Sequence, residues 1–287
     1  MTVTEFNNRL EAVITASADV KGDRVIVAQA MKYSLMAGGK RLRAMLSLGF
    51  CEAVSGDPER ALPAAFCVEL IHAFSLIHDD LPCMDDDNLR RGKPSCHIAF
   101  GEANALLAGD AMSLLSTEVI TDDEQLSDNE KLRLIRLFSK ASGIDGMIGG
   151  QTLDLLYETK TPTLTEIELM YELKTAALIS AAAQSGIISG GGTPEQESLA
   201  EAFGKKIGLA FQIEDDILDI TADPELLGKP IGSDEKSGKT TYVTLSGMEA
   251  SKVRVKGLYD EAFDILKKFD NNKKLIALTE ELSKRKY

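Results

Sequence analysis

Apolar residues recur at helical spacing along most of this chain, and this periodicity constrains the fold more than any other feature of the sequence. Leucine, isoleucine and phenylalanine follow one helical face over residues 132–138. Thr165 followed by Glu168 has the spacing of a capping box and predicts the start of an Ala-rich helix. The β-branched run Val25–Val27 is too short to build a sheet. The sequence therefore predicts an all-α fold.

The connections between the predicted helices are short. They lie at residues 121–130, 158–163, 189–196 and 221–239. None has the length or composition of an interdomain linker, and no internal repeat of fixed period occurs. A chain of 287 residues can bury a single large core. We therefore expect one domain over residues 1–287.

The charge balance of the chain restricts its partners. With 32 Lys and Arg against 45 Asp and Glu, the formal net charge is −13. Such an acidic protein is poorly suited to bind nucleic acid or an anionic membrane surface. If the protein binds anions, a local basic patch or bound metal ions must attract them.

The cysteines and the N-terminus indicate the compartment. The four cysteines show neither CxxC spacing nor a neighbouring His pattern, which argues against a zinc site and a disulfide framework. The N-terminus is polar, without the apolar region of a signal peptide, and no run of about 18 apolar residues occurs. We expect a cytoplasmic protein that does not enter a membrane.

A dense cluster of acidic residues follows one predicted helix. Five aspartates lie within the nine residues 79–87, and they repel one another unless cations neutralise them. Asp79 and Asp85 are six positions apart and would not face the same way in a regular helix. Pro82 is expected to end the helix near Asp80 and to let the chain loop back. The cluster therefore has the composition of a cation site built on a broken helix end.

A second acidic cluster lies far along the chain. Asp215 and Asp219 stand at i and i+4, with Gln212 one turn earlier, so the three form one polar stripe. An apolar stripe runs beside it, formed by Leu209, Ile213, Ile217 and Ile220. Carboxylate oxygens without His or Cys favour Mg²⁺ over zinc. Two aspartate-rich motifs in one helical chain therefore predict a magnesium site.

Basic residues occur near these motifs. Lys40 and Arg43 lie where a glycine-containing loop gives way to an apolar helix, a place where a diphosphate could also meet backbone N–H groups. His72 falls on the same helical face as Asp79. Further basic residues near motif-like segments are Arg90, Arg91, Lys174, Lys229 and Lys239. The predicted metal ions and these cations together indicate a diphosphate-binding enzyme.

Six segments carry a specific resemblance. They read GGKRLR, HAFSLIHDDLPCMDDDNLRRGKPSCH, GGQTLDL, LKTAALI, GLAFQIEDDILDI and GKPIGSDEKSGKTTYV. Over residues 38–245 they resemble, in the same order, the short-chain trans-prenyl diphosphate synthase family, particularly its bacterial farnesyl diphosphate synthases. The resemblance implies an all-α bundle around a deep central cavity, and a homodimer.

The resemblance also implies roles for individual residues. Asp79, Asp85 and Asp215 would bind Mg²⁺, about three ions per site, with Asp80 and Asp219 completing the two motifs. The allylic diphosphate would be held by Arg90, Lys174, Thr175, Gln212, Lys229 and Lys239, of which Lys174, Thr175, Gln212 and Lys229 form the catalytic group. The diphosphate of isopentenyl diphosphate would be held by Lys40, Arg43, His72 and Arg91. Gln151 and Asp154 would line the cavity.

The implied reaction fits these residue types. Isopentenyl diphosphate would condense head-to-tail with dimethylallyl and geranyl diphosphate to give (2E,6E)-farnesyl diphosphate and pyrophosphate. Metal ions and basic side chains stabilise the departing pyrophosphate, and a dry cavity protects the allylic cation. Pyrophosphate itself can accept the proton that is lost, so no dedicated protein base is required.

Product length depends on residues just before the first aspartate motif. Phe74 and Ser75 lie five and four positions before Asp79, and the resemblance implies that they set a fifteen-carbon product. A helix places Phe74 roughly 140° around its axis from Asp79, so Ser75 has the better orientation. Geranyl and geranylgeranyl diphosphate remain alternative products, and the preferred starter remains open.

Other classes of protein match the motifs less well. A metal phosphohydrolase of the HD type would need more histidines than His72, His78 and His97. A terpene cyclase would mix Asn, Ser or Thr and Glu in its second motif, where this chain has DDILD. A non-catalytic synthase subunit would be expected to lack aspartates in one cluster. The basic tail at residues 284–286 could cover the site or be a frayed end.

Overall fold

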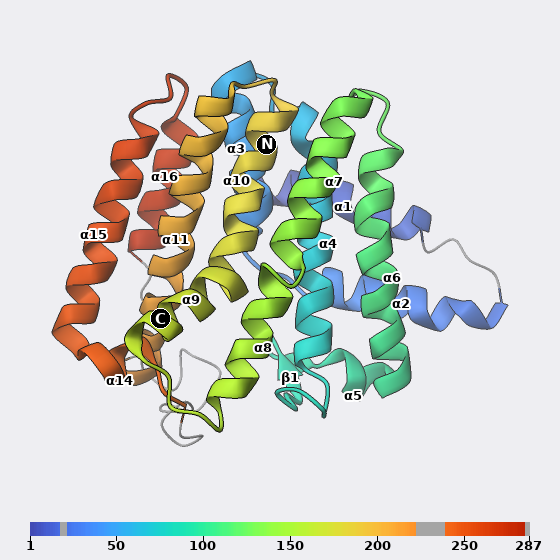
Figure 1. The fold of residues 1–287 in the computed structure, drawn as a ribbon. Coiled ribbons are helices and arrows are strands. Elements are labelled where there is room, and N and C mark those ends of the chain that lie inside the picture. The colour runs from blue at the N-terminus through green and yellow to red at the C-terminus, as the bar shows by residue number, and fades with distance from the viewer. Residues whose placement is uncertain (18–21, 222–238, 285–287) are drawn as a thin grey trace.

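The computed structural model describes residues 1–17, 22–221 and 239–284, and it is built almost entirely of helices (Figure 1). This confirms the all-α prediction. In chain order the elements are α1 (Val3–Ser17), the 3₁₀ turn η1 (Gly22–Arg24), α2 (Val25–Leu35), α3 (Leu42–Ser55), the 3₁₀ turn η2 (Pro58–Ala61), α4 (Leu62–Asp79), β1 (Leu89–Arg90), β2 (Lys93–Pro94), α5 (Cys96–Phe100), α6 (Glu102–Thr121), α7 (Asp128–Ser142), α8 (Met147–Tyr157), α9 (Leu164–Tyr171), the π-helical turn η3 (Glu172–Ala176), α10 (Ala177–Ser189), α11 (Pro194–Thr221), α14 (Tyr242–Ser246), α15 (Met248–Leu266) and α16 (Lys273–Ser283).

Long helices stand side by side and bury two apolar clusters. α10 packs against α3, α7 and α11, α15 packs on the other side of α11, and α4 packs against α6 (Figure 1). One cluster fills the space among α3, α10, α11 and α15, where Phe50 meets the rings of Phe203 and Phe269 edge-on. The other lies among α1, α2, α4 and α6. Because α4 contributes to both clusters, its C-terminal end is fixed from several sides.

Both aspartate motifs lie at the same end of the bundle. α4 and α11 run toward the end where β1 and α14 are found (Figure 1). Gly208 lets α11 approach η3 closely, since a Cβ at this position would lie 2.3 Å from the Cα of Ala176. This contact brings the first residues of the second motif against the turn that carries Lys174 and Thr175.

The start of the Ala-rich helix differs from the prediction. The capping box is formed by Thr163 and Glu166, and the predicted pair Thr165 and Glu168 lies inside α9. Both pairs have the T-x-x-E spacing, so the sequence alone does not separate them. In the earlier pair, the hydroxyl of Thr163 accepts from the backbone N–H of Glu166 at 3.3 Å, and the carboxylate of Glu166 accepts from the N–H of Thr163 at 2.8 Å. The helix is then interrupted by η3 before α10 begins.

The predicted connections correspond to gaps between helices. The stretch 121–130 contains the end of α6 and the start of α7, residues 158–163 separate α8 from α9, and residues 189–196 include the turn between α10 and α11. Nearly all of the predicted loop 221–239 lies outside the described residues. The described part of the chain contains one short hairpin, in which Leu89 pairs with Pro94 and Arg90 with Lys93.

One segment among the described residues is long and apolar enough to cross a membrane by length and composition. It spans Pro58–Asp79, and 67% of its most apolar window is buried inside the protein. The apolar character of this segment therefore reflects its place between the two clusters that α4 joins.

Candidate active site

The first aspartate motif turns back on the end of α4. The helix ends at Asp79, which confirms the expected break near Asp80. The backbone N–H of Met84 donates to the carbonyl of Leu81 at 2.8 Å, and the N–H of Asp85 donates to the carbonyl of Asp79 at 2.9 Å. Asp79 and Asp85 are therefore neighbours in space, as the loop around Pro82 predicts.

The carboxyl group of Asp79 lies in surroundings that disfavour its charged form. Burial, with a further contribution from Asp85, raises the pKa of its carboxyl from 3.8 to about 6, although Lys174 and Arg90 oppose this shift. A buried carboxylate beside a second carboxylate gains most from a bound cation. The oxygen-only donors of this motif therefore fit Mg²⁺ chemically.

The aspartates of the second motif lie on two different faces of α11. Asp216 is buried and accepts hydrogen bonds from the hydroxyl of Tyr171 at 2.7 Å and from the backbone N–H of Tyr242 at 2.9 Å. These bonds connect α11 to α9 and α14. Asp215 and Asp219 are half-buried and share a different face of the helix, because they are four residues apart. Asp216 therefore joins helices, while Asp215, the predicted metal ligand, lies on another face of α11.

A large cavity adjoins the first motif and the centre of the bundle. Its volume is about 460 Å³. Polar groups from several helices line it, among them Arg43, His72, Asp79, Gln151, Lys174 and Thr175, and its remaining wall is largely apolar, with Phe74, Leu76, Met84, Met147, Ile148 and Leu155. The cavity therefore combines charged groups with an apolar chamber.

Both predicted chain-length residues line this cavity. Phe74 and Ser75 lie on its wall, although Phe74 is turned away from Asp79 on the helix. The ring of Phe74 meets that of His78 edge-on at 5.9 Å between centroids. Phe74 also borders a separate cavity of about 80 Å³ between α4, α6 and α7. Because the large cavity wraps around α4, two helical faces contribute to it, and Phe74 separates the two spaces.

Lys174 and Thr175 lie on the π-helical turn η3. Such a turn interrupts the regular ladder and shifts the direction of the side chains that follow. α8 packs against this turn through Gly150, where a Cβ would lie 2.1 Å from the backbone nitrogen of Lys174. The hydroxyl of Thr175 donates to Oε1 of Gln212 on α11 at 2.9 Å. The turn therefore joins α8 and α11 at the cavity wall.

Asp154 on α8 lies between two of the predicted phosphate-binding lysines. Its Oδ2 is 2.6 Å from Nζ of Lys174 and 3.7 Å from Nζ of Lys239. Lys239 also lies 3.8 Å from Oε1 of Glu158. The sequence placed Asp154 only on the cavity wall, whereas the structure shows that it connects two lysines 65 positions apart (239 − 174).

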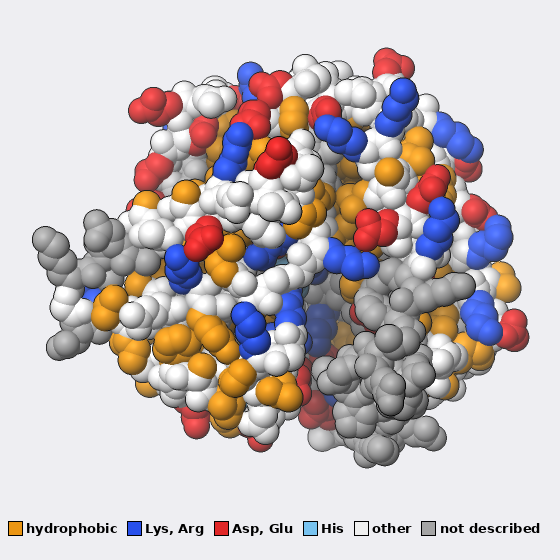
Figure 2. Space-filling view, turned by 180° about the vertical axis from the view of Figure 1, so that it is seen from behind, with side chains coloured by type: hydrophobic (Ala, Val, Ile, Leu, Met, Phe, Trp, Pro, Cys, Tyr) orange, Lys and Arg blue, Asp and Glu red, His pale blue; other side chains and the backbone are white. Residues whose placement is uncertain are grey.

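A basic pocket lies beside the large cavity. Figure 2 shows Lys and Arg side chains gathered around a hollow on the face turned away from the viewer in Figure 1. The pocket has a volume of about 440 Å³ and is lined by Lys40, Arg41, Leu42, Arg43, Glu69, His72, Arg90, Arg91, Phe211 and Leu282. Arg43 and His72 line both spaces, so the pocket and the large cavity adjoin.

Two side chains shared by these spaces have shifted pKa values. Burial lowers the pKa of Arg43 to about 10, which leaves it cationic at neutral pH, and its Nε has no hydrogen-bond partner among the described residues. Burial, together with the charges of Arg43 and three other arginines, lowers the pKa of His72 well below its usual value. His72 is therefore neutral, and Arg43 is a half-buried cation at the junction of the two spaces.

The other predicted basic residues have partners at the rim. Arg90 forms an ion pair with Asp80 and lies 3.3 Å from Asp87, and the bond and charge of Asp80 raise its pKa although burial alone would lower it. Nη1 of Arg91 donates to the carbonyl of Gly38. Lys40 is exposed and lies 3.5 Å from Glu281 of α16. Lys229 and residues 285–287 lie outside the described residues.

Two charged residues of the basic pocket were not predicted from the sequence. Arg41 was passed over within GGKRLR, and Glu69 lies in the apolar run of α4. The only available signal for Glu69 was a single carboxylate among buried apolar neighbours, which seldom occurs without a partner.

Comparisons with known proteins agree with this arrangement. The family model described as "Polyprenyl synthetase" matches residues 24–282. The chain is 41% identical to farnesyl diphosphate synthase of Haemophilus influenzae, over 99% of this chain and 96% of that protein. It is 44% identical to chloroplastic geranylgeranyl pyrophosphate synthase 12 of Arabidopsis thaliana, over 88% of this chain and 71% of that protein.

A solved structure extends the comparison to three dimensions. The geranyltransferase of Helicobacter pylori, in complex with magnesium and isoprenyl diphosphate, superposes with a TM-score of 0.86 at 32% identity. The alignment covers 98% of this chain and 96% of that one. Sequence motifs, fold and relatives agree, and the chain belongs to the polyprenyl synthetase family.

Proposed function

We propose that this protein is a prenyltransferase that condenses isopentenyl diphosphate with dimethylallyl and then geranyl diphosphate to give (2E,6E)-farnesyl diphosphate. The observation that carries the proposal is the junction of two spaces at Arg43 and His72. One space is apolar and flanked by the first aspartate motif, and the other is basic. An allylic diphosphate with its hydrocarbon tail suits the first, and a second diphosphate suits the other.

The proposed metal ligands are the aspartates of the two motifs. Asp79, Asp85 and Asp215 would hold about three Mg²⁺ ions, because Mg²⁺ in such sites takes one or two carboxylates and completes its shell with phosphate oxygens and water. When bound, Mg²⁺ neutralises charge on the leaving diphosphate. Among the described residues, no three His, Cys, Asp or Glu side chains form a metal site by themselves. This is consistent with donors shared between protein and substrate.

The residues of the chain would perform the remaining steps. Lys174, Lys239 and Arg90, with Lys229, would hold the allylic diphosphate as its C–O bond breaks, while Thr175 and Gln212 stay fixed by their mutual bond. The apolar wall would exclude water from the allylic cation. Lys40, Arg43, His72 and Arg91 would orient isopentenyl diphosphate so that its double bond forms the new C–C bond. The proton then lost would pass to pyrophosphate.

The direct test is an elongation assay. The protein is incubated with Mg²⁺, isopentenyl diphosphate and either dimethylallyl or geranyl diphosphate, and the dephosphorylated products are separated by chromatography. We expect a fifteen-carbon product from both starters. Absence of elongation with every starter would overturn the proposed function, whereas a twenty-carbon product would overturn only its chain length.

Product length is expected to change when Phe74 is shortened. Phe74→Ala should shift the main product beyond fifteen carbons, because the side chain separates the large cavity from the smaller one between α4, α6 and α7. Product length is read by chromatography with geranyl diphosphate as starter. Phe211→Ala, which removes an aromatic ring from the basic pocket, is the control and should keep the fifteen-carbon product. An unchanged product from Phe74→Ala would refute this role.

We also propose that the chain acts as one domain and as a homodimer. Leucines and an isoleucine on α5 and α6 are exposed although they are large and apolar: Ile98, Leu106, Leu107 and Leu114, the last with 75% of its surface accessible. Apolar patches of this kind mark interfaces. Leu114→Glu should therefore convert a dimer into a monomer in light scattering coupled to size exclusion. A monomeric wild-type protein at micromolar concentration would contradict the proposal.

A further inference from the structure

The buried carboxylate of Glu69, on α4, caps the N-terminus of the neighbouring helix α3. Glu69 of α4 accepts a hydrogen bond from the backbone N–H of Ala44 through Oε1 at 3.2 Å. The N-cap residue of α3, Arg41, provides no side-chain cap of its own. Glu69 therefore performs this capping role across the interface between α3 and α4. It is the only acidic side chain among the described residues that line the basic pocket.

The same carboxylate forms an ion pair with Arg41. Oε2 of Glu69 lies 3.2 Å from Nη1 of Arg41, and only 3% and 4% of the two side chains are exposed. Nε of Arg41 donates to Oδ1 of Asn7 on α1 at 2.8 Å, and Nη2 donates to the carbonyl of Leu35 at the end of α2 at 2.5 Å. Each edge of the guanidinium is thus bound, and α1, α2 and α4 meet at one side chain.

These contacts fix an unusual backbone turn. Arg41 adopts the left-handed conformation with φ 50° and ψ 37°, which residues other than glycine seldom adopt unless their surroundings require it. Its neighbours along the chain, Lys40 and Arg43, both line the basic pocket. The direction in which the chain leaves this turn determines where their side chains point. The Arg41–Glu69 pair therefore controls the geometry of the basic pocket without itself needing to touch a ligand.

The charge of Glu69 also acts on the neighbouring cations. Burial lowers the pKa of Arg43 and of Arg91, and the carboxylate of Glu69 opposes this in both cases. Without it, Arg41, Arg43 and Arg91 would face one another with no other acidic side chain among the described residues that line the pocket. Repulsion among them would then push their side chains apart.

We propose that Glu69 and Arg41 are positioning residues for the diphosphate of the non-allylic substrate. This inference rests on the proposed function, because it names the pocket that the pair serves. It predicts a selective defect. Loss of the pair should weaken the use of isopentenyl diphosphate and leave the use of the allylic diphosphate intact, since Lys174, Thr175 and Asp154 lie on other elements.

The test compares Michaelis constants for the two substrates. In Glu69→Gln we expect the KM for isopentenyl diphosphate to rise by about tenfold or more, because small misplacements of binding groups are costly. The KM for geranyl diphosphate should change by less than about twofold. Arg41→Asn should act in the same way, since Asn tolerates the left-handed conformation but removes the guanidinium. The KM for isopentenyl diphosphate in the double variant should be no higher than in the more impaired single variant, because the two side chains act as one unit.

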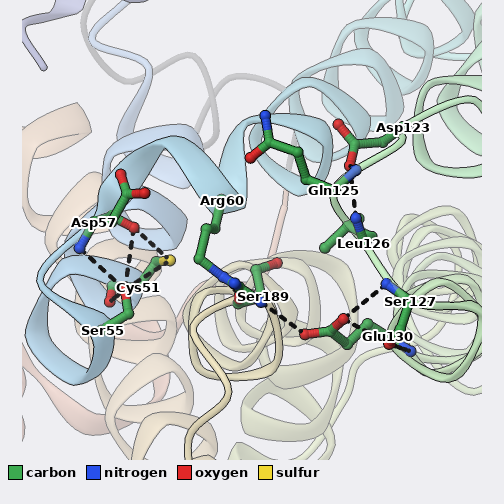
Figure 3. A network of polar contacts seen from close by, with 10 residues as sticks. All are labelled: Cys51, Ser55, Asp57, Arg60, Asp123, Gln125, Leu126, Ser127, Glu130 and Ser189. Carbon is green, nitrogen blue, oxygen red and sulfur yellow. Dashed lines mark hydrogen bonds and ion pairs between the residues drawn. The ribbon is translucent and has the colours of Figure 1, made fainter.

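A pair with similar contacts but greater exposure provides the control. Glu130 of α7 accepts from the backbone N–H of Ser127 at 2.8 Å and forms an ion pair with Arg60 at 3.2 Å, while Arg60 also donates to the carbonyl of Ser189 (Figure 3). Glu130 therefore caps a helix and binds an arginine, as Glu69 does, but far from the pocket in the fold. Glu130→Gln should leave both KM values within about twofold of wild type. This control separates the general effect of losing a capping carboxylate from the specific effect of losing Glu69.

A milder variant covers the case in which Glu69→Gln does not fold. Asn7→Ala removes one hydrogen bond to Arg41 and should raise the KM for isopentenyl diphosphate about twofold to threefold with an unchanged circular dichroism spectrum. Calorimetric titration of isopentenyl diphosphate without metal should show the same order of affinities: wild type, Asn7→Ala, Glu69→Gln.

The outcomes separate this inference from the proposed function. If the wild type does not elongate any starter, the proposed function fails. If the wild type is active and folded Glu69→Gln keeps or lowers the KM for isopentenyl diphosphate, the positioning role is overturned and the function stands. Equal increases in both KM values would also overturn it, because they would indicate a general loss of structure.

Discussion

Replacing Asp79 by Asn is expected to lower turnover by at least about 10³-fold while making the metal-free protein more stable at pH 8. The loss of activity follows from the proposed metal role, because removing several kcal/mol of charge stabilisation in the transition state has an effect of this size. The gain in stability follows from burial, which raises the pKa of the Asp79 carboxyl to about 6. At pH 8 the folded protein therefore holds an unfavourable charge that Asn removes.

The sign of the pH dependence can be stated for this group. Its folded pKa of about 6 lies above the ordinary value of 3.8, so the unfolded state releases the proton more readily. The contribution of Asp79 to the stability of the metal-free protein is therefore fully present below about pH 4 and is lost as the pH rises through about 6. The melting temperature of Asp79→Asn should exceed that of wild type by about 2–4 °C at pH 8 and by less at pH 5.

Two comparisons test the explanation. Mg²⁺ with pyrophosphate should raise the melting temperature of wild type and have a much smaller effect on Asp79→Asn, because only a ligand bound to the native state stabilises it. Asp216→Asn should instead lower the melting temperature, since Oδ2 of its carboxylate accepts both hydrogen bonds, and an uncharged amide oxygen accepts them more weakly. Near-normal turnover in Asp79→Asn would contradict the metal role.

Replacing Asp154 by Asn is expected to lower kcat/KM for the allylic substrate by about 10²-fold. Asp154 lies 2.6 Å from Lys174 and 3.7 Å from Lys239, so its charge holds two cations that converge from η3 and from the start of the C-terminal region. An amide keeps the size of the side chain but removes the attraction for both lysines. Steady-state kinetics with varied geranyl diphosphate measures the change.

Glu158→Gln is the control for Asp154→Asn. Glu158 also faces Lys239, but at 3.8 Å and with 47% of its side chain exposed, so this pair contributes little. The control should stay within about twofold of wild type. The KM for isopentenyl diphosphate should remain unchanged in Asp154→Asn, which is the reverse of the pattern expected for Glu69→Gln. If Asp154→Asn behaves like Glu158→Gln, Asp154 does not position the lysines.

The placement of individual elements shows where sequence patterns were sufficient. The helix that ends at Asp79 was predicted, because an apolar run followed by Pro82 leaves little choice for the backbone. The capping box was shifted by two residues, since two T-x-x-E patterns overlap and their spacing does not separate them. The π-helical turn was not predicted, because residue spacing does not distinguish it from a continuous α-helix; in the structure it packs against α8 at Gly150.

The sequence by itself determined the helical class, the family and the two aspartate motifs. Periodicity and motif spacing are local properties, and short segments carry them completely. Only the tertiary structure decided that Asp216 holds helices together, that Asp154 joins two lysines, and that Glu69 pairs with Arg41. These contacts join residues that lie far apart in the chain. Their strength comes from shared burial, which exists only once the helices have packed.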